Sequence, residues 1–251
     1  MTDSIRIGGT TFVLVHGAWH GGWCWKKLTP LLRAAGHEVY TPTLSGLGER
    51  AHLLSPQIGL ATHIADIVAL LEYEDLHNVI LVGHSYGSMV IAGVAERAVS
   101  RLTHLVYLDA FVSQDGQSLF DTRPDKGAPV RERAEKAGDG WQLPAGGSTF
   151  GVTDETDVQW LAARLTPQPL KCFTEPLRLT NPAALALPRT YILCRQGEAS
   201  IFDAHAERAQ RAGWHCHELR TGHDAMITVP EELANLLLTI ASEGSSVVIR
   251  Q

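Results

Sequence analysis

The chain has 251 residues and a formal net charge of −6 at pH 7, and 45% of its residues are hydrophobic while 19% are charged. A chain of this length and composition can build one large globular domain with a full apolar core. The acidic balance offers no basic surface, which argues against nucleic acid as a partner. No apolar run reaches membrane-spanning length, so we expect no membrane partner either.

The N-terminal residues and the cysteines indicate a cytoplasmic protein. Residues 1–6 contain no basic segment followed by an apolar stretch, so no secretory signal is visible. None of the four cysteines belongs to a C-x-x-C pair, and two of them lie in apolar runs of strand type. This usage is typical of reduced, buried thiols. The four are Cys24, Cys172, Cys194 and Cys216.

The first part of the chain alternates apolar runs with amphipathic segments. Continuous apolar runs are typical of strands that are buried on both faces of a parallel sheet. They predict strands at residues 11–16, 39–42, 79–82 and 105–111, with a short edge strand at 5–7. Apolar residues at helical spacing predict helices at about 29–36, 59–73 and 89–94. In the first of these helices, Thr29 is expected to be the N-cap and Pro30 the first helical residue.

The pattern changes between residues 112 and 187. Strand-type runs vanish, prolines become frequent, and large apolar residues are spread out. Because a structureless loop of this length is unusual in a compact domain, we predict a small, mostly helical cap here. It would be an insertion into the sheet domain, which comprises residues 1–111 and 188–251. The charge cluster at 131–136 is expected to be a solvated helix face and not a binding site.

After the predicted cap the alternation of strands and helices resumes, at residues 190–194, 202–212, 214–219 and 233–240. Thr228 and Glu231 fit a capping box at the start of the closing helix. His215 and His217 lie two residues apart on one face of the last strand, which would suit a metal pair. No third ligand is near in sequence, so we expect ordinary strand histidines and no metal or other cofactor.

This order of elements predicts an α/β fold, with a mostly parallel, doubly wound sheet covered by helices on both faces. Ligands of such sheets bind beyond the carboxyl ends of the strands. Ser85, Asp109 and His223 all fall at or just after predicted strand ends, as does the loop that begins at His16 and Gly17. We therefore expect these sequentially remote residues to converge on one rim.

Residues 83–87, Gly-His-Ser-Tyr-Gly, fit the G-x-S-x-G pattern of a nucleophile elbow. A serine on a tight turn between strand and helix has a strained backbone, and glycines beside it let the strand and helix approach closely. The next backbone N–H, that of Tyr86, would lie at a helix N-terminus and favour an anion. A Gly-rich turn with an incidental serine is the alternative interpretation of this pattern alone.

A serine hydroxyl needs a base, and a catalytic histidine needs a carboxylate that orients it. His223, in a loop after the last predicted strand, is the preferred base. Two carboxylates compete for the third position. We favour Asp109 over Glu198, which follows the next strand. Asp109 lies within the apolar run 105–111, where core packing does not explain a charged residue. Asp224 adjoins His223 and would have difficulty folding back onto its ring.

A tetrahedral oxyanion needs preorganised hydrogen-bond donors. The backbone N–H of Tyr86 is the first candidate donor. The second is expected from the loop after His16 and Gly17, with the N–H of Ala18 as the preferred group.

The segments 16–25 and 83–87 and the late run Gly222-His223-Asp224 together resemble the α/β-hydrolase superfamily. Within it, the chain is similar to the branch that holds plant methylesterases, hydroxynitrile lyases and bacterial carboxylesterases. The resemblance spans nearly the whole chain and is weakest in the predicted cap. It implies the α/β-hydrolase fold and the chain order serine, acid, histidine.

The chain departs from this branch at two positions. The plant branch usually places its acid as an aspartate after the strand that matches residues 190–194, where this chain offers only Glu198, whereas Asp109 resembles the acid site of haloalkane dehalogenases. Hydroxynitrile lyases carry a lysine after the histidine, where this chain has Asp224. Dehalogenases and epoxide hydrolases use an aspartate nucleophile where this chain has Ser85, so both activities are disfavoured.

The sequence therefore predicts a cofactor-free serine carboxylic-ester hydrolase that acts on small to medium hydrophobic esters through an acyl-enzyme. Its apolar pocket would draw on the loop 19–25 and on aromatic residues in or near the cap, namely Phe111, Trp141, Phe150, Trp160 and Phe173. Packing of the cap on its base would explain any one of these aromatics equally well. A lyase or C–C bond hydrolase with the same triad and a non-catalytic ligand receptor are the alternatives. The oligomeric state, monomer or homodimer, is left open.

Overall fold

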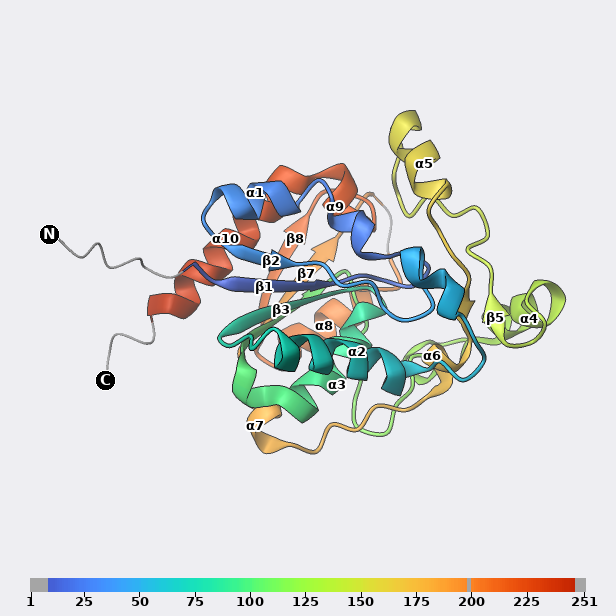
Figure 1. Cartoon of the computed structure of the whole chain (residues 1–251), viewed down its shortest axis with the longest axis horizontal. Coiled ribbons are helices and arrows are strands. Elements are labelled where there is room, and N and C mark those ends of the chain that lie inside the picture. The colour runs from blue at the N-terminus through green and yellow to red at the C-terminus, as the bar shows by residue number, and fades with distance from the viewer. Residues whose placement is uncertain (1–8, 198–199, 247–251) are drawn as a thin grey trace, which may run out of the picture.

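The computed structural model describes residues 9–197 and 200–246 (Figure 1). Its centre is a six-stranded sheet in the order β2-β1-β3-β4-β7-β8, and all neighbouring strands are parallel. This sheet confirms the predicted α/β fold class. In spatial order the strands are Glu38–Tyr40, Thr11–Val15, Val79–His84, Leu102–Leu108, Arg189–Cys194 and His215–Leu219. The predicted edge strand at residues 5–7 lies outside the described residues.

Helices cover both faces of the sheet (Figure 1). One face carries α1 (Thr29–Ala34), α9 (Ala225–Thr228) and α10 (Pro230–Ser246). The other carries α2 (Leu60–Tyr73), α3 (Gly87–Ala98) and α8 (Asp203–Arg211). Two apolar cores result, one on each side of the strands. No helix among the described residues is both long and apolar enough to cross a membrane.

The central strands have an apolar side chain on each face because each face meets a helical layer. In β1, Val13 and Val15 pack in the core beneath α2 and α3, while Phe12 and Leu14 pack in the core beneath α1 and α10. Every residue of β3 is buried. The edge strand β8 differs, since only its last residue, Leu219, is buried. Cys216 is therefore exposed, whereas the other three cysteines are buried as expected, and all four are free.

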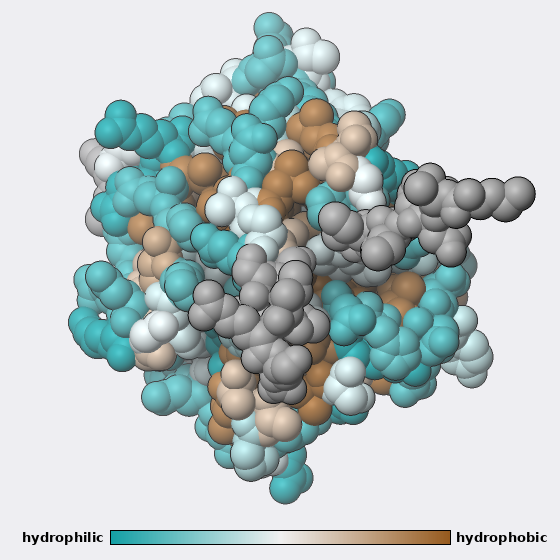
Figure 2. Space-filling view, turned by 90° about the vertical axis from the view of Figure 1, so that its left-hand side faces the viewer, coloured by the Kyte–Doolittle hydropathy of each residue, from teal (hydrophilic) through white to brown (hydrophobic). Residues whose placement is uncertain are grey.

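The 112–187 segment contains short helices and one feature that the sequence did not predict, a two-stranded antiparallel sheet of β5 and β6. Most of the segment lies beyond the carboxyl ends of the main strands (Figure 1). The opposite end of the molecule, at the amino ends of the main strands, shows hydrophilic side chains interspersed with apolar ones (Figure 2). The segment's elements are η4 (Phe120–Thr122), α4 (Ala128–Ala137), β5 (Gln142–Leu143), α5 (Glu155–Ala162), β6 (Gln168–Pro169), α6 (Lys171–Thr174) and α7 (Pro182–Leu185).

Two predicted helix caps are wrong. Thr29 is already helical, Leu28 occupies the N-cap position, and the Thr29 hydroxyl donates backward to the carbonyl of Trp25 at 3.0 Å. Thr228 ends α9 instead of capping α10, and its hydroxyl lies 3.1 Å from the Asp224 carbonyl and 2.5 Å from the Thr221 hydroxyl. In both cases a local partner takes the hydroxyl that the pattern assigned to a cap.

Candidate active site

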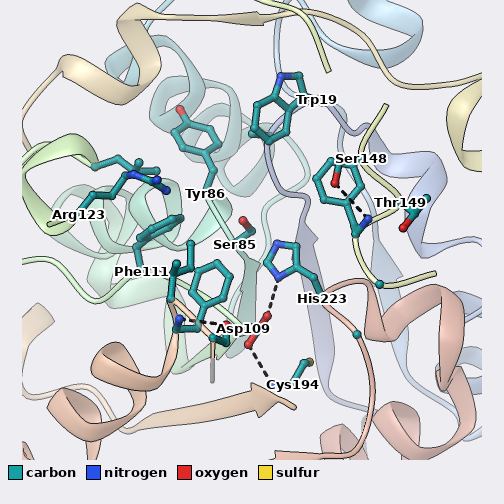
Figure 3. A pocket seen from close by; sticks show the side chains of 18 of the residues that line it. Trp19, Ser85, Tyr86, Asp109, Phe111, Arg123, Ser148, Thr149, Cys194 and His223 are labelled. Carbon is teal, nitrogen blue, oxygen red and sulfur yellow. Dashed lines mark hydrogen bonds and ion pairs between the residues drawn. The ribbon is translucent and has the colours of Figure 1, made fainter. Parts of the chain in front are cut away.

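Ser85 occupies a sharp turn between β3 and α3. Its φ is +52°, in the left-handed region that non-glycine residues rarely adopt. A Cβ at Gly83 would lie 2.7 Å from the carbonyl oxygen of Gly87, and one at Gly87 would lie 2.7 Å from that of Val15. The two glycines thus allow the close approach of strand and helix, and the turn raises Ser85 above the end of the sheet (Figure 3).

Asp109 and His223 meet beside this serine. Asp109 follows β4, also has a left-handed backbone (φ +43°), and is only 2% exposed. Its Oδ2 lies 2.6 Å from Nδ1 of His223, while its Oδ1 accepts a 3.0 Å hydrogen bond from the backbone N–H of Cys194. Figure 3 shows the His223 ring between this carboxylate and the Ser85 hydroxyl. The structure therefore brings together Ser85, Asp109 and His223.

The alternative acid, Glu198, lies outside the described residues. Within the described chain, no hydrogen bond joins the Ser85 hydroxyl to His223 in this conformation. Catalytic hydrogen bonds are often long in a substrate-free site and shorten in the Michaelis complex.

The two candidate oxyanion donors face the same cavity. Ala18 and Tyr86 both line it, and neither backbone N–H has an acceptor among the described residues. Tyr86 caps the N-terminus of α3, where the helix dipole favours an anion. Trp19 has a φ of +66°, and Gln168 accepts a 3.2 Å hydrogen bond from its backbone N–H. This contact with the 112–187 segment anchors the loop that carries Ala18.

The cavity above Ser85 has a volume of about 520 Å³, and several aromatic side chains form part of its wall. Phe202, which the sequence analysis did not single out, stacks on His223 with ring centroids 4.9 Å apart and an angle of 5° between the planes. Three of the five predicted pocket aromatics, Phe111, Phe150 and Phe173, line the cavity. Trp141 and Trp160 do not, and Trp160 instead packs edge-on against Trp23 at 5.1 Å.

Four buried histidines surround the turn, and three of them are held neutral. Burial lowers the pKa of His16 to about 3 and that of His63 to about 4. Burial and the nearby rings of His223 and His20 hold the pKa of His84 well below its ordinary value. His20 is the exception: burial would lower its pKa, but the charge and hydrogen bond of Asp224 raise it.

Ligand atoms of His84, His223 and Asp224 lie within 4.8 Å of one another, a spacing that a metal ion could use. Each of these side chains already has another partner. Nε2 of His84 faces the carbonyl of His223 at 3.1 Å, and Asp224 accepts a 3.0 Å hydrogen bond from His20. The arrangement fits a hydrogen-bond network better than a metal centre.

Comparison with known proteins places this geometry in a family. A model described as "Alpha/beta hydrolase family" matches residues 12–236. The chain is 42% identical over 241 residues to a carbendazim hydrolyzing esterase from Nocardioides sp. (strain SG-4G), covering 91% of this chain and 98% of that protein. It is 28% identical over 250 residues to the pFDCC methylesterase MES16 of Arabidopsis thaliana, covering 92% and 94% of the two chains.

Solved structures agree with these sequence matches. An extracellular α/β-hydrolase from a Paenibacillus species, described as sharing structural and functional homology with tobacco salicylic acid binding protein 2, matches with a TM-score of 0.80. The two sequences are 25% identical, and the match covers 92% of this chain and 98% of that one. The family resemblance predicted from the sequence motifs is confirmed: the chain belongs to the α/β hydrolase family.

Proposed function

We propose that this protein is a serine carboxylic-ester hydrolase that acts on small to medium hydrophobic esters through an acyl-enzyme and needs no cofactor. The observation that carries the proposal is the 2.6 Å contact between Nδ1 of His223 and Oδ2 of Asp109, beside Ser85 at the base of the cavity. The esterase names of its relatives support the same chemistry.

In the first half of the reaction, Nε2 of His223 takes the proton of the Ser85 hydroxyl as the oxygen attacks the ester carbonyl. The carbonyl oxygen becomes an oxyanion, which the backbone N–H groups of Ala18 and Tyr86 hold. Asp109 accepts the hydrogen bond from Nδ1 and stabilises the imidazolium. His223 then gives its proton to the leaving alcohol as the ester C–O bond breaks, which leaves the acyl group on Ser85.

In the second half, water enters and His223 takes one of its protons while the oxygen attacks the acyl carbonyl. A second tetrahedral oxyanion forms against the same two donors. When it collapses, the proton on His223 returns to Ser85 and the carboxylic acid leaves. Protons balance over the cycle, and the net reaction is hydrolysis of the ester.

The 112–187 segment is proposed to be the cap that selects the substrate. It supplies several lining residues, among them Phe120, Phe150 and Phe173. These rings favour an apolar acyl or alcohol group over a charged one. Carbendazim and small methyl esters belong in the first substrate panel, because relatives with those activities in their names cover nearly the whole chain.

Hydroxynitrile lyase chemistry has less support. Asp224, at the position where lyases of this branch carry a lysine, bonds to His20 and is not among the residues that line the cavity in the described chain. An assay of cyanohydrin cleavage run beside ester hydrolysis separates the two activities.

The decisive experiment compares Ser85→Ala with Ser55→Ala, a serine in the loop before α2. Ser85→Ala is expected to abolish p-nitrophenyl ester hydrolysis and labelling by a fluorophosphonate while the circular dichroism spectrum is unchanged. Ser55→Ala should retain both reactions. Turnover that survives in folded Ser85→Ala would refute the proposal, and failure of the wild type to react with the fluorophosphonate would favour the non-catalytic receptor.

A further inference from the structure

A buried ion pair joins the two halves of the candidate active site. Nδ1 of His20 lies 2.7 Å from the carbonyl oxygen of Ala18, and Nε2 lies 3.0 Å from Oδ2 of Asp224. His20 is 1% exposed and Asp224 is fully buried. The two residues are 204 positions apart in the chain, yet one is two residues from the oxyanion donor and the other adjoins His223.

The hydrogen-bond partners indicate that His20 is an imidazolium. A neutral imidazole donates from one nitrogen and accepts at the other, whereas both nitrogens of His20 face oxygens that accept. A buried carboxylate without a cationic partner would be very costly. His20 is the nearer of the two histidines that contact Asp224, at 3.0 Å against 3.7 Å for His84. The other titratable groups around the pair are His16, His84, His223 and the thiols of Cys24 and Cys194. The rings of Trp23 and Phe150 also pack against His20.

His84 adds a neutral contact between the pair and the base. Its Nε2 donates to the backbone carbonyl of His223 at 3.1 Å and lies 3.7 Å from Oδ1 of Asp224. Its ring centroid is 4.4 Å from that of His223. Because Nε2 carries the proton and Nδ1 has no partner among the described side chains, the ring stays uncharged. A neutral His84 places no second positive charge beside His223 when that base is protonated.

We propose that His20 and Asp224 are positioning residues, whose buried ion pair fixes the oxyanion donor Ala18 relative to the base His223. This inference rests on the proposed ester hydrolysis. The pair ties the loop after β1 to the loop after β8, and neither partner lines the cavity in the described chain. Since His20 neutralises Asp224, the carboxylate charge that acts on the His223 ring is that of Asp109, its hydrogen-bond partner.

The placement predicts a specific kinetic signature. Displacement of an oxyanion donor reduces the stabilisation of the transition state much more than the binding of the substrate, because the oxyanion exists only in the transition state. Loss of the pair should therefore lower kcat by about 10- to 100-fold, the effect expected when a catalytic group moves by about 1 Å. KM should change by less than about threefold.

The test uses three variants of the pair and one matched control. His20→Gln can keep the bond to Asp224 but loses the bond to Ala18, and His20→Asn does the reverse. Asp224→Asn removes the charge, but its amide can still donate to a neutral His20, so it should lose less activity than either His20 variant. The control is His77→Asn, since His77 forms a similar contact with Asp75 at 3.2 Å on the exposed surface.

Two readouts separate positioning from simple destabilisation. The first is kcat per active site, with sites counted by fluorophosphonate labelling, and the second is the inhibition constant of a trifluoromethyl ketone, which forms an oxyanion on Ser85. In His20→Gln and His20→Asn, kcat should fall and the inhibition constant should rise by the same factor. In His77→Asn both should stay unchanged. A variant with a lower Tm but the wild-type kcat per labelled site and ketone affinity would overturn the proposal.

A third measurement needs neither activity nor a folded variant. In the ¹H–¹⁵N spectrum of the wild type near neutral pH, His20 should show a proton on each ring nitrogen. A neutral tautomer there would refute the ion pair. A wild type that fails to hydrolyse any ester but shows this imidazolium would refute the proposed function and with it the kinetic role, while leaving the pair itself in place.

Discussion

Nδ1 of His223 lies 2.6 Å from Oδ2 of Asp109, although 114 residues separate them in the chain. The other carboxylate oxygen, Oδ1, is held by the backbone N–H of Cys194 at 3.0 Å. The carboxylate is therefore fixed at both oxygens, and its orientation determines which ring nitrogen of His223 carries the proton.

Asp109→Asn is expected to lower kcat by about 10⁴-fold, the size of effect seen when a triad histidine takes the wrong tautomer. The Cys194 N–H would retain the amide oxygen, so the NH₂ group would face Nδ1 of His223. Nδ1 would then have to accept, and the proton would move to Nε2, where it blocks removal of the proton from Ser85. Steady-state hydrolysis of a p-nitrophenyl ester measures the loss.

Glu198→Gln is the matched control for the acid. It should retain activity within about threefold, because a charge removed outside the triad changes kcat little. The opposite pattern, an inactive Glu198→Gln beside an active Asp109→Asn, would show that Asp109 is not the triad acid.

The cavity wall predicts an acyl-chain preference that Phe173 controls. Phe173 is buried in α6, with its ring 5.5 Å from Tyr86 and 5.7 Å from Phe120. Phe173→Ala should raise the ratio of kcat/KM for p-nitrophenyl octanoate over acetate by about tenfold or more, since each added methylene that fits contributes to binding. Trp160→Ala, which removes an aromatic of the same segment outside the cavity, should leave this ratio unchanged; equal ratios in both variants would contradict the assignment.

Arg123 is the one lysine or arginine among the described residues that line the cavity. Its guanidinium donates two hydrogen bonds, of 3.0 and 2.8 Å, to the carboxylate of Asp125. These bonds from Arg123 are the main reason that the pKa of the Asp125 carboxyl is lowered to about 2. We expect Asp125→Asn to raise kcat/KM severalfold for a p-nitrophenyl ester with a terminal carboxylate, because the guanidinium loses its competing anion. Arg123→Gln should lower it, and the neutral ester of equal length should respond to neither change.

Acidification should destabilise the fold because several histidines are buried as neutral rings. Burial lowers the pKa of His63, His104 and His205 to about 4 and that of His16 to about 3. Below about pH 6.5 the unfolded chain binds protons that the folded chain does not, so the free energy of unfolding falls as the pH drops toward 4. His20 has the opposite sign, since its raised pKa stabilises the fold at low pH and loses that effect as the pH rises through it.

His205→Asn tests this account with one group. Nδ1 of His205 accepts from the backbone N–H of Val112 at 3.1 Å, and an asparagine oxygen can take that role without titrating. Urea unfolding should show that the variant loses about 1–2 kcal/mol less stability than the wild type between pH 6.5 and 5. Parallel pH profiles for the two proteins would contradict the assignment.

The parts of the fold that the sequence predicted are those with a strong local pattern. Residues 12–15 of β1 and 79–82 of β3 are apolar at every position because helices cover both faces of the sheet. The glycines around Ser85 mark a close backbone approach. The strands β5 and β6 are two residues long each, which is too short for any periodicity to appear. The residue types and the chain order indicated Asp109 and His223, and the side chains of these two residues are in contact in the structure.

Other site features depend on contacts between distant segments and left no local signal. The pairing of His20 with Asp224 joins two loops that nothing in the sequence relates, and Phe202 reaches His223 only because α8 begins beside the end of β7. The predicted capping box failed for a similar reason, since Thr228 found a nearer partner in Thr221. A list of polar residues near strand ends would have contained His20 and Asp224, but not their pairing.

Gly151 and Gly222 touch backbone to backbone, and a Cβ on either would lie 2.5 Å from the Cα of the other. Beside them, the N–H of Asp224 donates to the carbonyl of Phe150 at 3.1 Å. The segment over the cavity is thus bonded to the loop that carries His223. A chimera that exchanges this segment between relatives must therefore keep both Gly151 and Gly222. A side chain at either position would push the two backbones apart and displace His223.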